Sequence, residues 1–204
     1  MKKTGLRYDW NDINITHKVP PTTLLVKGES EFYAEEFVIS TTIDIGDELE
    51  QPCGMMEITK FHVNKTVNDC ESLYDLFDYT EEGLRASNAM KLWDLPEASS
   101  VYYISTIGVN PQYRQYHVGK SMVDAFLFNY IGMYDLAVLQ PHPFMNVVGI
   151  WKGKEDWVSC GRSKEKGKKT LNRYWQSRGF ERYKKTQYMF YAGELLVDAM
   201  LDKN

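Results

Sequence analysis

Residues 101–141 constrain the fold more than any other part of the chain. VYYISTIGV (101–109) is apolar on both faces, which is typical of a central strand. Residues 117–131 have the pattern of a helix, and YDLAVLQP (134–141) has the pattern of a second buried strand. The order strand–helix–strand occurs here and again over residues 134–191, and strands joined through a helix pair in parallel, with right-handed crossovers. The segment therefore predicts an α/β protein with a parallel strand pair inside its sheet.

The amino-terminal half predicts further strands of the same sheet. TTLLVKGE (22–29) and FYAEEFVISTTIDI (32–45) are rich in β-branched and aromatic residues, and MMEITKFHVNKT (55–66) alternates apolar and polar residues. One slip in that alternation indicates a β-bulge. GDELEQPCG (46–54) contains Gly, Pro and acidic residues, so we expect a hairpin loop there. These strands predict a meander.

The remaining segments predict helices on both faces of a mixed sheet with six to seven strands. We expect one domain over residues 1–204, of the α/β class with a mixed sheet. The expected segments are a helix from Asp69 to about Trp93 with a break near Gly83, an irregular insertion at about 141–169, a helix over 170–180 closed by Gly179, one or two strands over 181–191, and a terminal helix over 193–203.

Composition excludes several classes of protein. Apolar residues make up 43% of the chain, which is enough for a core. The three cysteines form no C-x-x-C pair, and the four histidines form no HExxH motif, so we expect no metal and a reducing, cytoplasmic environment. The amino terminus lacks the apolar run of a signal peptide, and no segment approaches the roughly 18 apolar residues of a membrane helix.

The charge is divided unevenly along the chain. Residues 28–97 contain 17 acidic and 4 basic residues, a net charge of −13. Residues 151–185 contain 12 basic and 4 acidic residues, a net charge of +8. A basic segment in an acidic protein indicates a phosphate-bearing partner, although a solvated lysine-rich loop has the same composition. The acidic region favours a cationic small molecule or a lysine side chain as partner, although an acidic surface also serves solubility.

The connection VNPQYRQYHVGKSM (109–122) leads from a strand into a helix. Unpaired amides at a helix start, together with the helix dipole, attract an anion by roughly 0.3–1 kcal/mol per charge. Gly119 allows close approach of a ligand to the main chain, and Arg114 and Lys120 add positive charge. The connection is neither a P-loop nor a GxGxxG turn. Its chemistry suits a pyrophosphate.

This connection resembles motif A of the GNAT N-acetyltransferase superfamily. The family pattern is V-x-P-x-Y-R followed by [QR]-x-x-G-x-[GA], and His117 stands where the first glycine is usual. That departure implies either a negative φ at the turn or a contact between His117 and the ligand. TLNRYWQSRGFERY (170–183) resembles motif B, so the likeness covers residues 100–191. The matching residues of motif A are Val109, Pro111, Tyr113, Arg114, Val118 and Gly119.

The resemblance implies a GNAT-like sheet, splayed between its fourth and fifth strands, and acetyl-CoA as co-substrate. The chain would then transfer an acetyl group to a primary amine by direct attack in a ternary complex, without a metal. Main-chain groups of Ile107, Gly108 and Val109 would hold the pantetheine and the acetyl carbonyl. The pyrophosphate would lie on the amides of the turn, which belong to Gln115, Tyr116, His117, Val118, Gly119 and Lys120. Arg114 and Ser121 would lie beside it.

The resemblance leaves the catalytic residues open. The family often has a Glu on the fourth strand, where this chain has none, so Glu57 on the preceding strand is the substitute base, or else an exposed strand carboxylate. Trp175 occupies the place of the family's acidic Tyr and cannot donate a suitable proton. Tyr174 is adjacent, but one helical step turns it by ~100°, so it is either the acid or part of the core. Solvent can also protonate the thiolate.

Other residues and functions remain as alternatives. His142 is a second candidate base or a turn residue, and Cys160 is a nucleophile or a free thiol. Three aromatic residues of the insertion either line an acceptor pocket or anchor the insertion: Phe144, Trp151 and Trp157. The alternative function is a non-catalytic module that binds CoA, or nucleic acid through 151–185. The acceptor, an acyl group other than acetyl, and a homodimer are left open.

Overall fold

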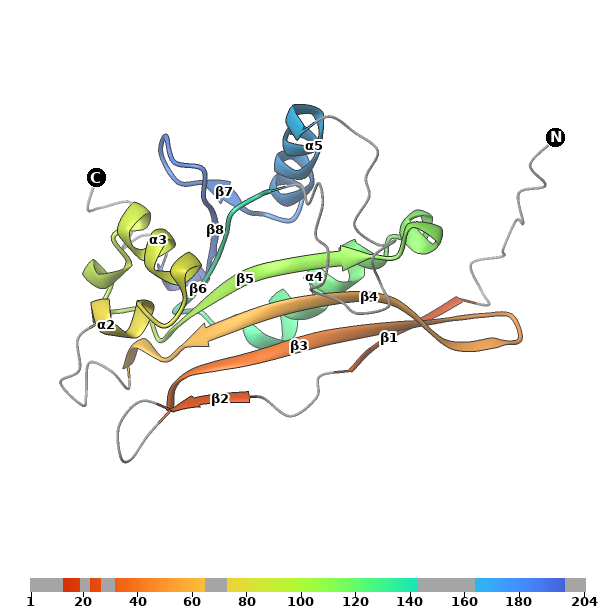
Figure 1. Cartoon of the computed structure of the whole chain (residues 1–204), viewed down its shortest axis with the longest axis horizontal. Helices are drawn as coiled ribbons and strands as arrows, with labels where there is room; N and C mark the ends of the chain where they lie inside the picture. Colours follow the sequence, from red (N-terminus) through yellow and green to blue (C-terminus); the bar gives the residue numbers. More distant parts are fainter. Residues whose placement is uncertain (1–12, 19–22, 27–31, 65–72, 143–163, 197–204) are drawn as a thin grey trace.

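The computed structural model describes five stretches of the chain: residues 13–18, 23–26, 32–64, 73–142 and 164–196. They form one eight-stranded mixed sheet with helices on both faces, which confirms the expected class (Figure 1). The strands are β1 (Ile13–Lys18), β2 (Thr23–Val26), β3 (Phe32–Ile45), β4 (Glu48–Phe61), β5 (Ser100–Val109), β6 (Asp135–Leu139), β7 (Glu181–Arg182) and β8 (Met189–Ala192).

The strands lie in the order β1-β3-β4-β5-β6-β8-β7, and β2 also pairs with β3. The helices are α2 (Leu73–Phe77), α3 (Glu81–Met90), α4 (Val118–Tyr130) and α5 (Lys164–Gln176), with two 3-10 segments, η2 (Leu92–Asp94) and η3 (Pro111–Tyr116). The predicted strand over 32–45 has the bounds of β3.

The β3–β4 hairpin corrects the prediction of a long loop over 46–54. Ile45 pairs with Glu48, so the turn consists of two residues, and Gly46 adopts the left-handed φ of 57° that such turns require. Pro52 lies within β4 where the register shifts, and a bulge tolerates proline inside a strand. The prediction was wrong because loop-forming residues here occupy a largely exposed strand.

β1 was not predicted from the sequence. It pairs antiparallel with β3, from Ile13 opposite Ile45 to Lys18 opposite Ser40. Its six residues, INITHK, contain only two apolar side chains, so their pattern differs little from that of a polar loop. The strand forms because the long β3 offers it a free edge beside β2.

The two crossover units of the second half differ. β5 and β6 are parallel, as predicted, with Ser100 opposite Asp135 and Ile104 opposite Leu139. β6 and β8 are antiparallel, so a second parallel pair was a wrong prediction. The reason is that β8, rather than β7, lies next to β6, and the turn between β7 and β8 reverses the chain.

Two helices have other bounds than expected. The break between α2 and α3 lies at residues 78–80, just before Gly83, because the Thr80 hydroxyl accepts a hydrogen bond from Gly83 N at 2.8 Å and caps α3. α5 begins at Lys164, whereas the sequence predicted an irregular connection up to 169. Lysine is a good helix former, so the exposed start of α5 needs no apolar pattern.

The core has one large cluster on each face of the sheet. α2, α3 and η2 pack on one face against Val101, Tyr103 and Leu136. α4 and α5 pack on the other face, where Phe126 and Trp175 join Tyr102. Residues of β5 and β6 alternate between the two clusters, which fixes both strands from both sides. This packing holds the β5–α4 connection in place.

We predict that Phe126→Ala lowers the free energy of unfolding by about 3–5 kcal/mol, because Phe126 is fully buried between α4 and β5. Phe128 lies on the same helix and is 89% exposed, so Phe128→Ala should change stability by less than about 0.5 kcal/mol. Urea denaturation of both variants measures the difference. Equal effects would contradict the described packing of α4.

Candidate functional site

β5 and β6 are paired only along the first half of β5. Their ladder ends at Ile104 and Leu139, while β5 continues five residues further, to Val109, alongside β4. At the same point β5 carries an extra residue, because Ile104 and Thr106 face consecutive residues of β4 and Ser105 lies between them. The prediction of a bulge within residues 55–66 was therefore wrong about the strand, because the extra residue lies on β5. A bulge bends its strand, which favours the separation of β5 from β6.

A cavity of about 370 Å³ lies where the two strands separate. Its walls come from residues 103–107 of β5 and residues 139–142 at the end of β6. α3 contributes Glu82 and Arg85, and α5 contributes Leu171 and Trp175. The contributions of α3 and α5 to the cavity were not predicted, because these two helices come together only through the fold.

The start of α4 follows the end of β5 after a connection that consists of Asn110, η3 and His117. Asn110 N donates to Cys53 O at 2.9 Å, and the Asn110 side chain accepts from Gln112 N at 3.2 Å, which starts η3. A 3-10 segment uses amides within its own length, as Tyr113 N does by donating to Asn110 O. The first amides of α4 have no acceptor within their helix. Of the main-chain amides predicted to bind an anion, those of residues 115–120, the amides of residues 118–120 therefore remain as donors.

His117 joins η3 to α4 with a φ of 55°. The alternative of a negative φ at this position was therefore wrong. Histidine is among the residues that adopt the left-handed region more readily than most, so the backbone keeps the conformation that a glycine would favour. The side chain of His117 is exposed.

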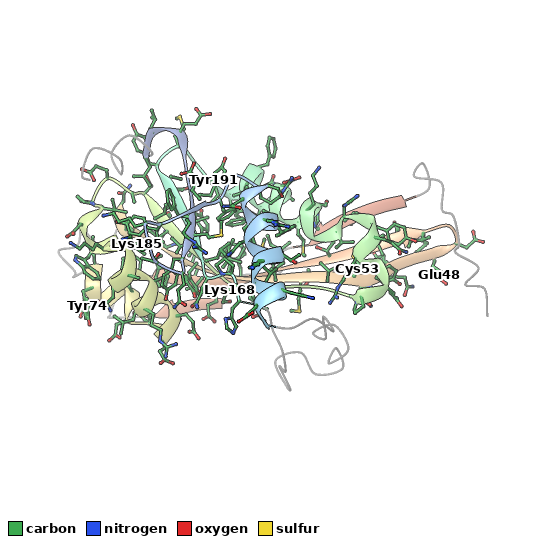
Figure 2. All side chains as sticks on the ribbon, turned by 90° about the horizontal axis from the view of Figure 1, so that it is seen from above. Glu48, Cys53, Tyr74, Lys168, Lys185 and Tyr191 are labelled. Carbon is green, nitrogen blue, oxygen red and sulfur yellow. The ribbon has the colours of Figure 1, made fainter. Side chains whose placement is uncertain are left out.

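The other predicted residues of the connection divide into core and surface. Tyr116 and Val118 are buried in a small cluster with Cys53, so only their main chains can reach a ligand (Figure 2). Gln115 and Lys120 are exposed. This division was not predicted, because the motif does not distinguish side chains that pack beneath the turn.

Two polar side chains hold the connection to its surroundings. Arg114 is exposed, and its Nε donates to Val109 O at 3.2 Å, across the turn. The Ser121 hydroxyl lies 2.9 Å from His17 Nε2, and His17 Nδ1 lies 2.9 Å from the Thr41 hydroxyl. Burial lowers the pKa of His17, so the ring is neutral at pH 7 and can donate on one side and accept on the other. Ser121 is thus engaged with β1.

Tyr174 places a buried hydroxyl beside the start of α4. Among the described residues this hydroxyl has no hydrogen-bond partner. It lies 3.4 Å from the position that a Cβ at Gly119 would occupy. Burial raises the pKa of Tyr174, while Arg178 lowers it and Asp124 raises it by smaller amounts, so the phenol is a neutral donor at pH 7. A buried donor without a partner among the described residues is rare, which makes this hydroxyl a candidate donor to a ligand.

The predicted turn of ~100° between Tyr174 and Trp175 separates their surroundings. Trp175 lines the cavity between β5 and β6, whereas Tyr174 faces Gly119 and lies outside the cavity lining. Arg178, one turn after Tyr174, contacts Asp124 of α4 with Nη1–Oδ distances of 3.0 and 3.2 Å. This contact ties the end of α5 to α4 and holds Tyr174 near the helix start.

The predicted residues of β5 lie at the cavity and at its mouth. Ile107 lines the cavity, and Gly108 and Val109 follow at the half-buried end of the strand. Along this part of β5 the edge that faces away from β4 has no ladder partner within the described strands. Main-chain groups of this edge are therefore placed to bind a ligand.

The two candidate bases differ in position. His142 lines the cavity at the end of β6. Glu57 does not line the cavity. It lies on β4 opposite Thr106 of β5, which does line the cavity, and the two side chains are on the same face of the sheet. Glu57 therefore borders the cavity wall. The other candidates from the sequence lie outside the described residues: Phe144, Trp151, Trp157 and Cys160.

Comparison with known proteins found no matching family model, and no curated protein or solved structure that matches the chain. None of the helices described is long and apolar enough to cross a membrane. Over residues 13–18, 23–26, 32–64, 73–142 and 164–196, no group of three or more His, Cys, Asp or Glu side chains is arranged to hold a metal ion.

We predict that Tyr174→Phe stabilises the free protein by roughly 1 kcal/mol, because a buried hydroxyl without a partner costs about 1–3 kcal/mol. Chemical denaturation without ligand measures this change. A clear loss of stability would show that the hydroxyl is already bonded in the free protein.

Proposed function

We propose that the chain is an acetyl-CoA-dependent N-acetyltransferase of the GNAT type that acts on a primary amine. The observation that carries the proposal is the cavity of about 370 Å³ at the point where the β5–β6 ladder ends. This cavity lies beside a helix start that follows from the same strand. A thioester arm and a diphosphate need such an arrangement, with a strand edge for the arm and helix amides for the anion.

The residues at the start of α4 fit the coenzyme. The amides of residues 118–120 and the side chain of Lys120 would hold the pyrophosphate. The unpartnered Tyr174 hydroxyl supplies a further donor at the same place. The free edge of residues 105–109 would hold the pantetheine, and residues 105–107 of this edge line the cavity.

The proposed chemistry requires little from the protein beyond positioning and proton transfer. A thioester supplies an electrophilic carbonyl, so no metal is needed to activate it. Glu57 would remove a proton from the acceptor ammonium through a water molecule, since Thr106 separates it from the cavity. Tyr174 faces the start of α4 and not the cavity, so solvent would protonate the departing thiolate.

The cavity also bears on the acceptor. Glu82 lies in its lining, where a carboxylate favours a cationic amine. Arg85 lies one turn later and is paired with Glu81, which reduces its repulsion toward such a substrate. A panel of polyamines, amino sugars and lysine peptides, assayed by release of free thiol from acetyl-CoA, tests the activity and identifies the acceptor class. No thiol release with any amine would count against the proposal.

We predict that Gly119→Glu abolishes the stabilisation by acetyl-CoA, because the new side chain meets Tyr174 and places a negative charge among the amides of α4. At 100 times the dissociation constant a ligand adds about 2.7 kcal/mol, or roughly 5–10 °C in Tm for a chain of this size. Thermal unfolding with acetyl-CoA measures the shift. Phe128→Glu adds the same charge to an exposed position of α4 and should keep the full shift.

We predict that Glu57→Gln lowers kcat about 10²-fold at pH 7 with little change in KM, because it removes the base without altering the shape of the cavity wall. The loss should shrink as the pH approaches the pKa of the amine, since the substrate then deprotonates in solution. Steady-state kinetics from pH 6 to 10 test this. An unchanged kcat in Glu57→Gln, together with a fall in His142→Gln, would assign the proton transfer to His142.

A further inference from the structure

A second pocket lies between α5 and the β7–β8 hairpin and has a volume of about 310 Å³. The described residues that line it are all different from those that line the cavity between β5 and β6. They are Lys169, Asn172, Arg173, Gln176, Arg182 and Met189. Five of them are polar or charged, and Met189 is the buried residue at its base.

The four lining residues of α5 occupy one face of the helix. Positions 169, 172, 173 and 176 follow the spacing i, i+3, i+4 and i+7, which places them along one side of the helix. α5 packs into the core through a different side, with Leu171 and Trp175. The polar side lines the pocket together with Arg182 of β7.

The charge around this pocket is positive. Lys169, Arg173 and Arg182 line it, and the described part of the lining contains no carboxylate. None of these three side chains takes part in an ion pair with another described residue. Three like charges around one concave surface repel one another, and a bound anion would relieve that repulsion.

We propose that this pocket binds the phosphoryl group of a small phosphorylated molecule. Arginine offers a planar pair of donors that matches phosphate oxygens, and lysine adds a point charge. Asn172 and Gln176 add amide donors between these cations. A pocket of about 310 Å³ lies at the lower end of the range for small-molecule sites and suits a ligand of nucleotide size.

The pocket favours a compact ligand over a single strand of nucleic acid. Base stacking requires accessible aromatic faces, but Trp175 is 2% exposed and the Tyr174 hydroxyl is buried. Those two residues were the aromatic partners that the basic segment offered from the described part of α5. None of the described residues that line the pocket is aromatic.

This site is independent of the proposed coenzyme site. Tyr174 faces α4, Trp175 faces the first cavity, and the cationic face turns toward the hairpin. The proposal holds whether or not the chain transfers acetyl groups. The two sites can therefore be tested by separate substitutions.

The test is calorimetric titration of the full chain with pyrophosphate. We expect Arg173→Gln with Arg182→Gln to weaken binding at least tenfold. The matched control is Lys166→Gln with Lys185→Gln, which removes two exposed charges of the same helix and hairpin outside the pocket and should change binding less than twofold (Figure 2 labels Lys185). Thermal unfolding without ligand checks that both double variants fold.

Two further arms separate this site from the others. Because pyrophosphate would also bind at the proposed coenzyme site, the titrations are repeated in the Gly119→Glu background, where the tenfold effect of the Arg173/Arg182 double variant should persist. The Arg173/Arg182 double variant should keep the Tm shift with acetyl-CoA. Absence of pyrophosphate binding, equal loss in the control variant, or loss only in Gly119→Glu would overturn the proposal. A ten-nucleotide oligothymidylate should bind more weakly than pyrophosphate, and binding of the oligonucleotide alone would also overturn it.

Discussion

The end of the main-chain ladder between β5 and β6 is the constraint on which the site depends. Beyond Ile104 the strand keeps β4 on one edge, so its backbone stays extended while the other edge turns toward the cavity. The extra residue Ser105 sits at this transition. A continuous ladder would fill the space with paired strands, and the cavity would not exist.

The position of α4 follows from that strand. Phe126 packs against Tyr102 on the paired part of β5, with ring centroids 5.6 Å apart, while the helix start emerges from the unpaired part. His17 links the first turn of α4 to β1 and β3 through Ser121 and Thr41. Distant parts of the chain thus fix a helix start that a local motif only suggests.

Local patterns predicted the elements whose determinants are local. The central strand, the helix after it and the parallel pair are set by apolar runs and a turn, and they were predicted correctly. β1 and the link between His17 and Ser121 depend on partners 22 or more residues away, which a local sequence pattern does not contain. The walls from Glu82 and Leu171 were missed for the same reason. For the turn itself, the motif predicted its place but not the left-handed φ of His117.

The burial of the Tyr174 hydroxyl should affect the rate at which a ligand is released. Removal of water from a polar group normally opposes ligand binding. The Tyr174 hydroxyl is already buried in the folded protein, so binding does not have to desolvate it. An oxygen atom that arrives at Gly119 meets a dry donor held by its ring contact with Trp175, with centroids 5.2 Å apart. Such a donor should lengthen the residence time of its guest, because release would leave the proton unsolvated once more.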